Sequence, residues 1–409
     1  MLSRMKPIPV CFLLVVSICL IVNTGVNRSA ESADFLPVVS SNDSLLKYLW
    51  QDTAPIRCIA VGDFDVTSDG AEIVCGGESG NVTMLKGRRN TWTATTLLEV
   101  SGTIEFLDIG DLDILHEGNE IVVASLDDHL PLAGEGPGGP EYWGIRVLAG
   151  SGNNWNSTLV FKTENAFGKI WGLKVGDFNI SNPGDEIIAC WEFWFDIASV
   201  HVYSYDGVMW TDTIVYTGNM VIMDADIGEV NSSHPGTEII LLDEDGEYIQ
   251  LVQNDTSWEP TCIWAPPEIY AGREVEIGDV DVHHPGDEIV VRTRFVPGII
   301  LLTETNTSWT PTWILNGSVL FTDVGIGDIF RNHAGKELIA IQDRNVTLIW
   351  NRGQRWYHQV IWRDLAPLSC LSVGDFDSYY PGDELVVAGH SRYVSRILYR
   401  LFPSSLDIV

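Results

Sequence analysis

The sequence predicts an all-β fold, a seven-bladed β-propeller in which an N-terminal strand completes the last blade. Three observations lead to this prediction. A glycine-containing motif occurs seven times, the stretches between the motifs have the pattern of short β-strands, and a segment before the first motif matches the segment before the last one. Repeats of about 50 residues that are built from short strands are typical of propellers.

The motif starts with an apolar residue, glycine and an acidic residue, and it ends with a second glycine and a glutamate. The glutamate always lies ten residues after the first glycine, and successive motifs are 47 to 52 residues apart, with one longer interval of 66. Such regular copies predict that each one belongs to a single blade of a ring. The copies begin at Val61, Ile109, Val175, Ile227, Ile277, Ile326 and Val373.

Each repeat predicts four strands. Strand A ends at the first glycine, and strand B starts at the glutamate and is almost entirely apolar, which suits a strand buried on both faces. Strand C is β-branched and aromatic, and strand D follows a polar turn and often begins with tryptophan. We interpret these tryptophans as residues that pack blades together, not as a binding stripe. They are Trp92, Trp155, Trp210, Trp258, Trp309 and Trp356.

The seventh repeat has no strand D of its own before the chain ends. The stretch LWQDTAPIRCIAVGDFD from Leu49 matches IWRDLAPLSCLSVGDFD from Ile361, in which the first residues belong to an outer strand. We therefore predict that residues 45–50 form an outer strand that pairs with residues 394–401. This pairing closes the ring and leaves no open sheet edge between the first and last blades.

The N-terminal residues predict export. Residues 1–25 have a positive start at Arg4 and Lys6 and an apolar stretch from Val10 to Val22, as in a signal peptide or an uncleaved anchor. Residues 26–44 are then a short linker, and residues 45–409 form the propeller. Ten N-x-S/T sequons agree with a secreted or cell-surface glycoprotein. They start at Asn27, Asn42, Asn81, Asn156, Asn179, Asn231, Asn254, Asn306, Asn316 and Asn345.

Composition excludes several classes of function. The net charge of −32 repels nucleic acid, and we expect no membrane insertion unless the N-terminal segment stays uncleaved. Five cysteines remain after the signal segment, so disulfides are not the main framework, and without a C-x-x-C pair no structural zinc site is expected.

The repeated G-D-x-D/N…G-x-E-I/L resembles the FG-GAP or VCBS repeats of integrin α-subunit propellers and related extracellular adhesion proteins, over nearly the whole predicted mature chain. In that family the loop between strands A and B often binds calcium through acidic side chains. Here the loop is one residue longer and lacks the third acid. The resemblance makes Ca²⁺ the one candidate cofactor. The candidate ligands are Asp177, Asn179 and Asp185 in blade 3, Asp279, Asp281 and Asp287 in blade 5, and Asp375, Asp377 and Asp383 in blade 7.

A purely structural interpretation of the same loop residues stays open. The first Asp or Asn side chain can accept backbone N–H groups in an Asx-turn, and the glutamate can brace the amides of the loop. Acidic residues also occupy alternate positions of several strands A, which predicts that they share one face and line the central channel, either crowded or solvated by channel water. They are Asp108, Asp224, Asp226, Glu274, Glu276 and Asp323.

We predict a ligand site in the loops between strands B and C and between strands D and A, which share one face of a propeller. Blade 2 has the one long B–C insertion, and blade 3 follows with CWEFWFD. Exposed aromatic rings at this density favour a sugar ring or a protein partner, and the integrin-like resemblance implies ligand on the same face. The alternative is that the rings fold inward. The candidate residues are Asp127, Asp128, Tyr142, Trp143, Phe167, Trp171, Trp191, Phe193 and Trp194.

No hydrolase, metalloprotease, phosphate-loop or dinucleotide motif is found, so we expect a binding protein and not an enzyme. The expected ligand is a glycan or a protein, as for an extracellular adhesion-type propeller. Two alternatives stay open: a lyase-like enzyme acting on polysaccharide, and a purely structural assembly protein. A pocket with converging Arg or Lys and a perturbed base favours the enzyme.

Overall fold

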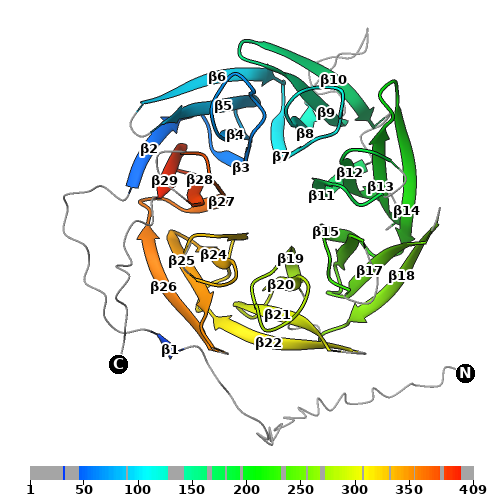
Figure 1. Cartoon of the computed structure of the whole chain (residues 1–409), viewed down its shortest axis with the longest axis vertical. Helices are drawn as coiled ribbons and strands as arrows, with labels where there is room; N and C mark the ends of the chain where they lie inside the picture. The colour runs from blue at the N-terminus through cyan, green and yellow to red at the C-terminus, as the bar shows by residue number, and fades with distance from the viewer. Residues whose placement is uncertain are drawn as a thin grey trace, which may run out of the picture.

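The computed structural model describes residues 31–32, 46–88, 91–127, 142–163, 168–179, 182–193, 197–231, 236–254, 257–267, 272–305, 308–330, 333–353, 355–377 and 382–397. Seven sheets surround a central opening, which confirms the predicted seven-bladed β-propeller (Figure 1). Within these residues no helix is long and apolar enough to cross a membrane. The predicted signal segment lies outside them.

Each blade is a sheet with strand A at the centre of the ring and strand D at the rim. Blade 1 contains β3 (Ile56–Gly62), β4 (Glu72–Gly77), β5 (Asn81–Arg88) and β6 (Thr91–Glu99). Blade 2 contains β7 (Thr103–Gly110), β8 (Glu120–Asp127), β9 (Tyr142–Ser151) and β10 (Asn154–Lys162). Blade 3 contains β11 (Gly168–Gly176), β12 (Glu186–Phe193), β13 (Ile197–Tyr205) and β14 (Trp210–Gly218). Blade 4 contains β15 (Ile222–Gly228), β16 (Glu238–Asp243), β17 (Tyr248–Asn254) and β18 (Ser257–Trp264).

The remaining blades follow the same order. Blade 5 contains β19 (Gly272–Gly278), β20 (Glu288–Thr293), β21 (Gly298–Thr305) and β22 (Ser308–Asn316). Blade 6 contains β23 (Asp323–Gly327), β24 (Glu337–Gln342), β25 (Asn345–Asn351) and β26 (Trp356–Arg363). Blade 7 contains β27 (Leu368–Gly374), β28 (Glu384–Gly389), β29 (Tyr393–Ile397) and the N-terminal β2 (Leu46–Gln51).

The predicted closure is confirmed. Strand β2 pairs antiparallel with β29, with Leu46 opposite Ile397 and Gln51 opposite Tyr393, so a strand from the N-terminal part and three strands from the C-terminal part of the chain share blade 7 (Figure 1). The described strands differ by one residue at their starts from the predicted segments, and residues beyond Ile397 lie outside the described ones. Within the predicted linker, β1 (Glu31–Ser32) pairs in parallel with β26, which gives blade 6 a short fifth strand.

Packing between blades explains the first glycine of the motif. A Cβ atom on Gly62 would lie 2.9 Å from Cγ2 of Ile109 in the next blade, and one on Gly374 would lie 2.7 Å from Cγ1 of Val61. Real Cβ atoms do not approach side chains so closely, so only glycine lets neighbouring strands A meet. The second glycine has a different reason, because its φ is positive, as at Gly70 with 91°.

The strand D tryptophans pack against the residue that follows Gly-Asp in the preceding blade. Phe64 meets Trp155 edge-on with ring centroids 5.9 Å apart, and Phe178 meets Trp258 in the same way at 6.0 Å. Such edge-to-face pairs are favourable aromatic contacts. The interpretation of the tryptophans as packing residues is therefore confirmed.

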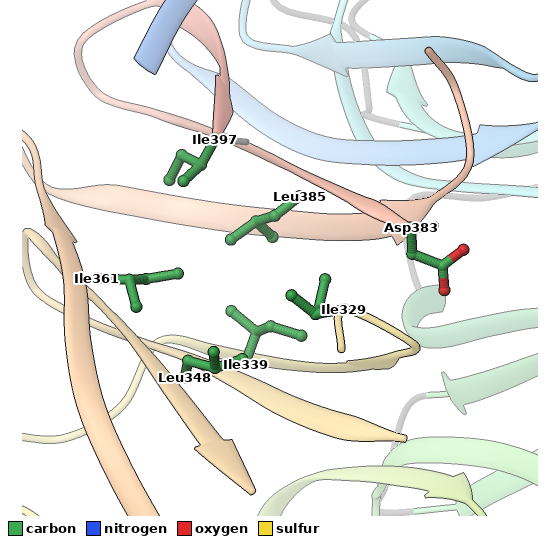
Figure 2. A pocket seen from close by; sticks show the side chains of 7 residues that line it. All are labelled: Ile329, Ile339, Leu348, Ile361, Asp383, Leu385 and Ile397. Carbon is green, nitrogen blue, oxygen red and sulfur yellow. The ribbon is translucent and has the colours of Figure 1, made fainter. Parts of the chain in front are cut away.

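One interface lacks this contact. Strand D of blade 7 comes from the N-terminal segment, in which Ser44 stands at the aligned position of the tryptophan. Between blades 6 and 7 the structure has a small, partly open hollow, about the size of a water molecule, that is lined by apolar side chains and Asp383. Figure 2 shows Ile329, the residue after Gly-Asp in blade 6, pointing into it with Ile339, Leu385 and Ile397.

Replacement of Ile329 by phenylalanine is expected to stabilise the protein by about 0.5–1.5 kcal/mol, because the larger ring fills free apolar space. Thermal or urea unfolding measures the change. Val280→Phe is the matched control, since Val280 holds the same motif position but already belongs to a filled cluster beside Trp356. We expect that change to destabilise by about 1–3 kcal/mol through overpacking. Equal effects of both changes would show that the hollow does not matter.

Candidate functional site

The predicted aromatic site on the face of the B–C and D–A loops is only partly exposed. Tyr142 and Trp143 are each 6% exposed and Trp191 is fully buried, so the expectation that these three rings are presented to solvent is wrong. Trp191 donates from Nε1 to the Tyr203 hydroxyl at 3.2 Å and stacks on Phe193. Trp143 and Trp191 fold inward because the interface of blades 2 and 3 offers them an apolar cluster.

The remaining residues of this set are placed as follows. Phe193 and Trp171 are half-buried, and Trp171 donates to the Glu192 carboxylate at 2.6 Å while the Lys169 ammonium lies 3.2 Å from its ring centroid. Asp127 ends β8, and its side chain is not among those described. Asp128, Phe167 and Trp194 lie outside the described residues. Ligand binding by this set stays a prediction.

On the same face, large apolar side chains are exposed over blades 5 and 6. Phe295 in the B–C loop of blade 5 is 54% exposed, and Val319 and Leu320 in the following D–A loop are 53% and 43% exposed. The two loops are joined, because the Gly317 N–H donates to the Pro297 carbonyl at 2.9 Å. We call Phe295, Val319 and Leu320 the blade 5–6 patch.

Three arginines of blade 5 lie beside this patch, and we call Arg273, Arg292 and Arg294 the arginine cluster. Arg292 is buried, donates to the Phe321 carbonyl at 2.9 Å and forms an ion pair with Glu274. Arg294 lies over the Phe295 ring. Burial, together with Arg292 and Arg294, lowers the pKa of Arg273 from its ordinary value. The sequence analysis missed this cluster, although Arg292-Thr293-Arg294 is unusual in so acidic a chain.

Two of the predicted acidic residues meet a lysine in the central channel. Lys174 of blade 3 has its Nζ 3.3 Å from a carboxylate oxygen of Asp226 in blade 4 and 3.3 Å from one of Glu276 in blade 5. Blades 3 and 5 are not neighbours, so this contact lies in the channel. The prediction that these acids face the channel is confirmed for Asp226 and Glu276.

Burial governs the protonation of the channel acids. Desolvation raises the pKa of Asp108 to about 6 and that of Asp224 to about 7, although Lys174 opposes both shifts. The pKa of Glu276 is also raised by burial, with Asp226 and Glu274 adding to it. Glu274 differs, because burial raises its pKa but the attraction of Arg292, the hydrogen bonds from Asp323 and Arg292, and the attraction of Lys174 together lower it. Among the described residues, the six channel acids outnumber Lys174 and Arg292, the two cations that form ion pairs with them.

The channel acids also fasten neighbouring blades. Asp108 accepts from the Val175 N–H at 2.7 Å, Asp226 from Ile277 at 2.6 Å and Asp323 from Leu371 at 2.6 Å. These bonds join blade 2 to 3, 4 to 5 and 6 to 7. A second set joins the same pairs at the A–B loops. There Asp185 accepts from the Asp111 N–H, Asp287 from Glu229 and Asp383 from Asp328.

The A–B loops are held by hydrogen bonds, as in the structural interpretation of the motif. Glu288 accepts the Val280 and Asp281 N–H groups at 3.0 and 2.9 Å. In each of the other six blades, the equivalent glutamate accepts backbone N–H groups of its own A–B loop. Five of the nine proposed calcium donors already have partners outside their own loop. Asp377 pairs with Arg396, Asn179 accepts from Gln253, and Asp185, Asp287 and Asp383 bind the preceding blade.

Among the described residues no group of three His, Cys, Asp or Glu is arranged to hold a metal ion. Asp177, Asp279 and Asp375 are exposed, and Asp281 contacts the His283 ring at 2.9 Å. Calcium binding at these loops stays a prediction, and an ion would have to displace the bonds just described.

Because calcium would have to displace these bonds, we expect a weak site. After treatment with a chelator, the protein should bind calcium with a dissociation constant no lower than about 10⁻⁴–10⁻³ M, the range of weak extracellular sites. Isothermal titration with CaCl₂ and the melting temperature measure this. Asp281→Asn should remove any heat of calcium binding that comes from the loop of blade 5. Tight binding at three sites per chain would contradict the expectation and show that the loops rearrange.

Comparisons with known proteins agree on the fold. No family model and no curated protein sequence matches this chain. A structure of BBS1N in complex with ARL6DN is similar with a TM-score of 0.56 and 14% identity, covering 88% of this chain and 98% of that one. A structure of YCF48 bound to D1 peptide is similar with a TM-score of 0.53 and 14% identity, covering 91% and 100%. At this identity the likeness shows the seven-bladed propeller fold alone.

Proposed function

We propose that this propeller is an exported recognition protein that binds a protein partner on the face of its B–C and D–A loops. The observation that carries the proposal is the blade 5–6 patch, in which three large apolar side chains are exposed on two joined loops. Exposed apolar groups that lie together commonly mark protein-binding surfaces. The similar propellers were solved with a protein, ARL6DN, and with a peptide, which supports a protein ligand.

Export rests on the N-terminal segment and the sequons. Of the sequon asparagines, Asn156, Asn254 and Asn316 are exposed, as glycan attachment requires. The resemblance of the motif to FG-GAP repeats supports an extracellular, adhesion-type role, and the acidic surface supports solubility.

The experiment is an array of peptides, proteins and glycans probed with the full chain and with Phe295→Ser/Leu320→Ser. We expect protein or peptide binding that weakens about tenfold or more in the double variant, because buried apolar contact area is lost. The matched control is Leu115→Ser/Val208→Ser, which removes residues 81% and 84% exposed on the opposite face. Binding confined to glycans, or lost equally in the control, would contradict the proposal.

A polysaccharide lyase is the second candidate, and one observation favours it. The arginine cluster contacts Glu274, and Glu274 is a charged neighbour of Asp224, whose pKa burial raises to about 7. A cation and a base therefore lie on one side of the channel, as elimination from an acidic sugar requires. Incubation with oligouronides, followed by ultraviolet absorption of the unsaturated product, tests it. The proposed function predicts no product, and product formation that is lost in Asp224→Asn would replace it.

A further inference from the structure

We infer that Arg273 and Arg294 form a carboxylate-binding site, and that the partner is a peptide with a carboxylate beside an apolar side chain. The inference rests on the proposed function and names the chemistry of its ligand. It follows from the partners of each arginine, from the neighbouring patch and from the charge of the whole protein.

The first step is the set of partners that each arginine has. Of the three, Arg292 alone has a carboxylate, Glu274, and it is 8% exposed. Arg294 donates to a backbone oxygen, the Glu244 carbonyl, at 3.5 Å. Arg273 is exposed, and in the described part of the chain neither it nor Arg294 has an ion pair.

The second step is the cost of this arrangement. The chain has 56 acidic and 24 basic residues, so carboxylates are available almost everywhere on its surface. Blade 5 nevertheless gathers three arginines, and their mutual repulsion contributes to the lowered pKa of Arg273. Lys169 of blade 3, on the other side of the channel, also repels Arg273. A bound carboxylate would relieve this repulsion, and Arg forms paired hydrogen bonds with carboxylates.

The third step is the kind of molecule that brings the carboxylate. The blade 5–6 patch adjoins the cluster, because Arg294 lies over the Phe295 ring at 5.1 Å and Arg292 donates to Phe321, next to Leu320. A ligand that uses both surfaces therefore carries an apolar group next to its carboxylate. The net charge of −32 repels polyanions such as nucleic acid at long range, which favours a peptide with one or two carboxylates.

Two sources supply such a carboxylate, an Asp or Glu side chain and a chain terminus. The experiment uses synthetic peptides with a Leu-Phe core in three forms: an adjacent Asp with an amidated end, an adjacent Asn with a free end, and an adjacent Asn with an amidated end. An oligogalacturonide is the fourth probe. Fluorescence anisotropy or calorimetry with the full chain measures each affinity.

We expect at least one carboxylate form to bind and the neutral peptide to bind about tenfold more weakly or worse. Arg273→Gln/Arg294→Gln should remove this preference, while Arg273→Lys keeps part of it. The matched control is Arg352→Gln/Arg355→Gln, because both residues are exposed arginines of the C–D hairpin in blade 6, on the opposite face. Unchanged melting temperatures exclude a loss of fold.

The outcomes separate this inference from the proposed function. If the neutral peptide binds equally well and binding depends on Phe295 and Leu320 alone, the carboxylate site is overturned and the protein-binding face stands. If neither the arginine nor the patch variant changes peptide binding, both are overturned. If the oligogalacturonide alone binds, the inference that the ligand is a peptide is overturned and the polysaccharide alternative is favoured. If no probe binds, the carboxylate-binding site itself is overturned.

Discussion

Deletion of residues 26–52 is expected to destabilise the entire ring by about 5 kcal/mol or more, a large part of the stability of an ordinary domain. Strand β2 is lost, with its five paired positions along β29. Leu49 and Trp50 also leave the apolar cluster that joins blades 7 and 1, where Val394 and Ile56 are fully buried. Both the last blade and its contact with the first one are weakened.

Urea unfolding of the truncated and the intact protein measures this loss. Deletion of residues 26–32 is the control, because it removes only β1 and leaves blade 7 complete. We expect the control to unfold like the intact protein. If the truncated protein unfolds at the same urea concentration as the intact protein, the ring does not need its N-terminal strand.

Lys174→Met is expected to cost about 3–5 kcal/mol near neutral pH, since it leaves buried carboxylates without their cation. Asp226 and Glu276 lose a direct ion pair, and Asp108 and Asp224 lose an attraction that lowers their pKa values. The control is Arg88→Met, because its partner Asp69 is 86% exposed and such a pair contributes at most about 1 kcal/mol.

The loss of stability caused by Lys174→Met should increase with pH. Asp108 and Asp224 have folded pKa values of about 6 and 7, above the ordinary value of 3.8, so the folded state binds more protons than the unfolded one between these limits. Stability from these groups therefore falls as pH rises from 4 to 7. Without Lys174 the shifts grow, and the variant should lose more stability at pH 8 than at pH 5. A cost that is equal at both pH values would contradict this account.

The fold was predictable from sequence because its determinants repeat. The first glycine of the motif has no room for a Cβ atom in six of the seven blades, and the second glycine has a positive φ in all seven, so both recur at fixed spacing. The closure was predictable for the same reason, since Leu49 and its neighbours copy the segment from Ile361.

The candidate site was less predictable, because exposure is decided by packing between blades and not by residue type. Trp191 and Trp143 look like exposed rings in sequence but fill the interface of blades 2 and 3. Phe295 is exposed although it closely follows strand B, in which the first apolar residues after the glutamate are buried in every blade. The sequence does contain a signal for the arginine cluster, the Arg-Thr-Arg-Phe run that starts at Arg292, but this run has only one aromatic residue.

The carboxylate bonds between neighbouring blades have a consequence for how such a ring can change. They join blades 2 and 3, 4 and 5, and 6 and 7 at two levels each, so the two-blade unit is the natural building block. Gene duplication or deletion that inserts or removes one such unit separates none of these six carboxylate–amide pairs. A single-blade change separates a pair and leaves carboxylates without their amides. Rings of five or nine blades therefore keep more of these bonds than rings of six or eight. Outside the three units, Asp65 of blade 1 accepts a hydrogen bond from the Gly152 N–H of blade 2, and such a change can break this bond.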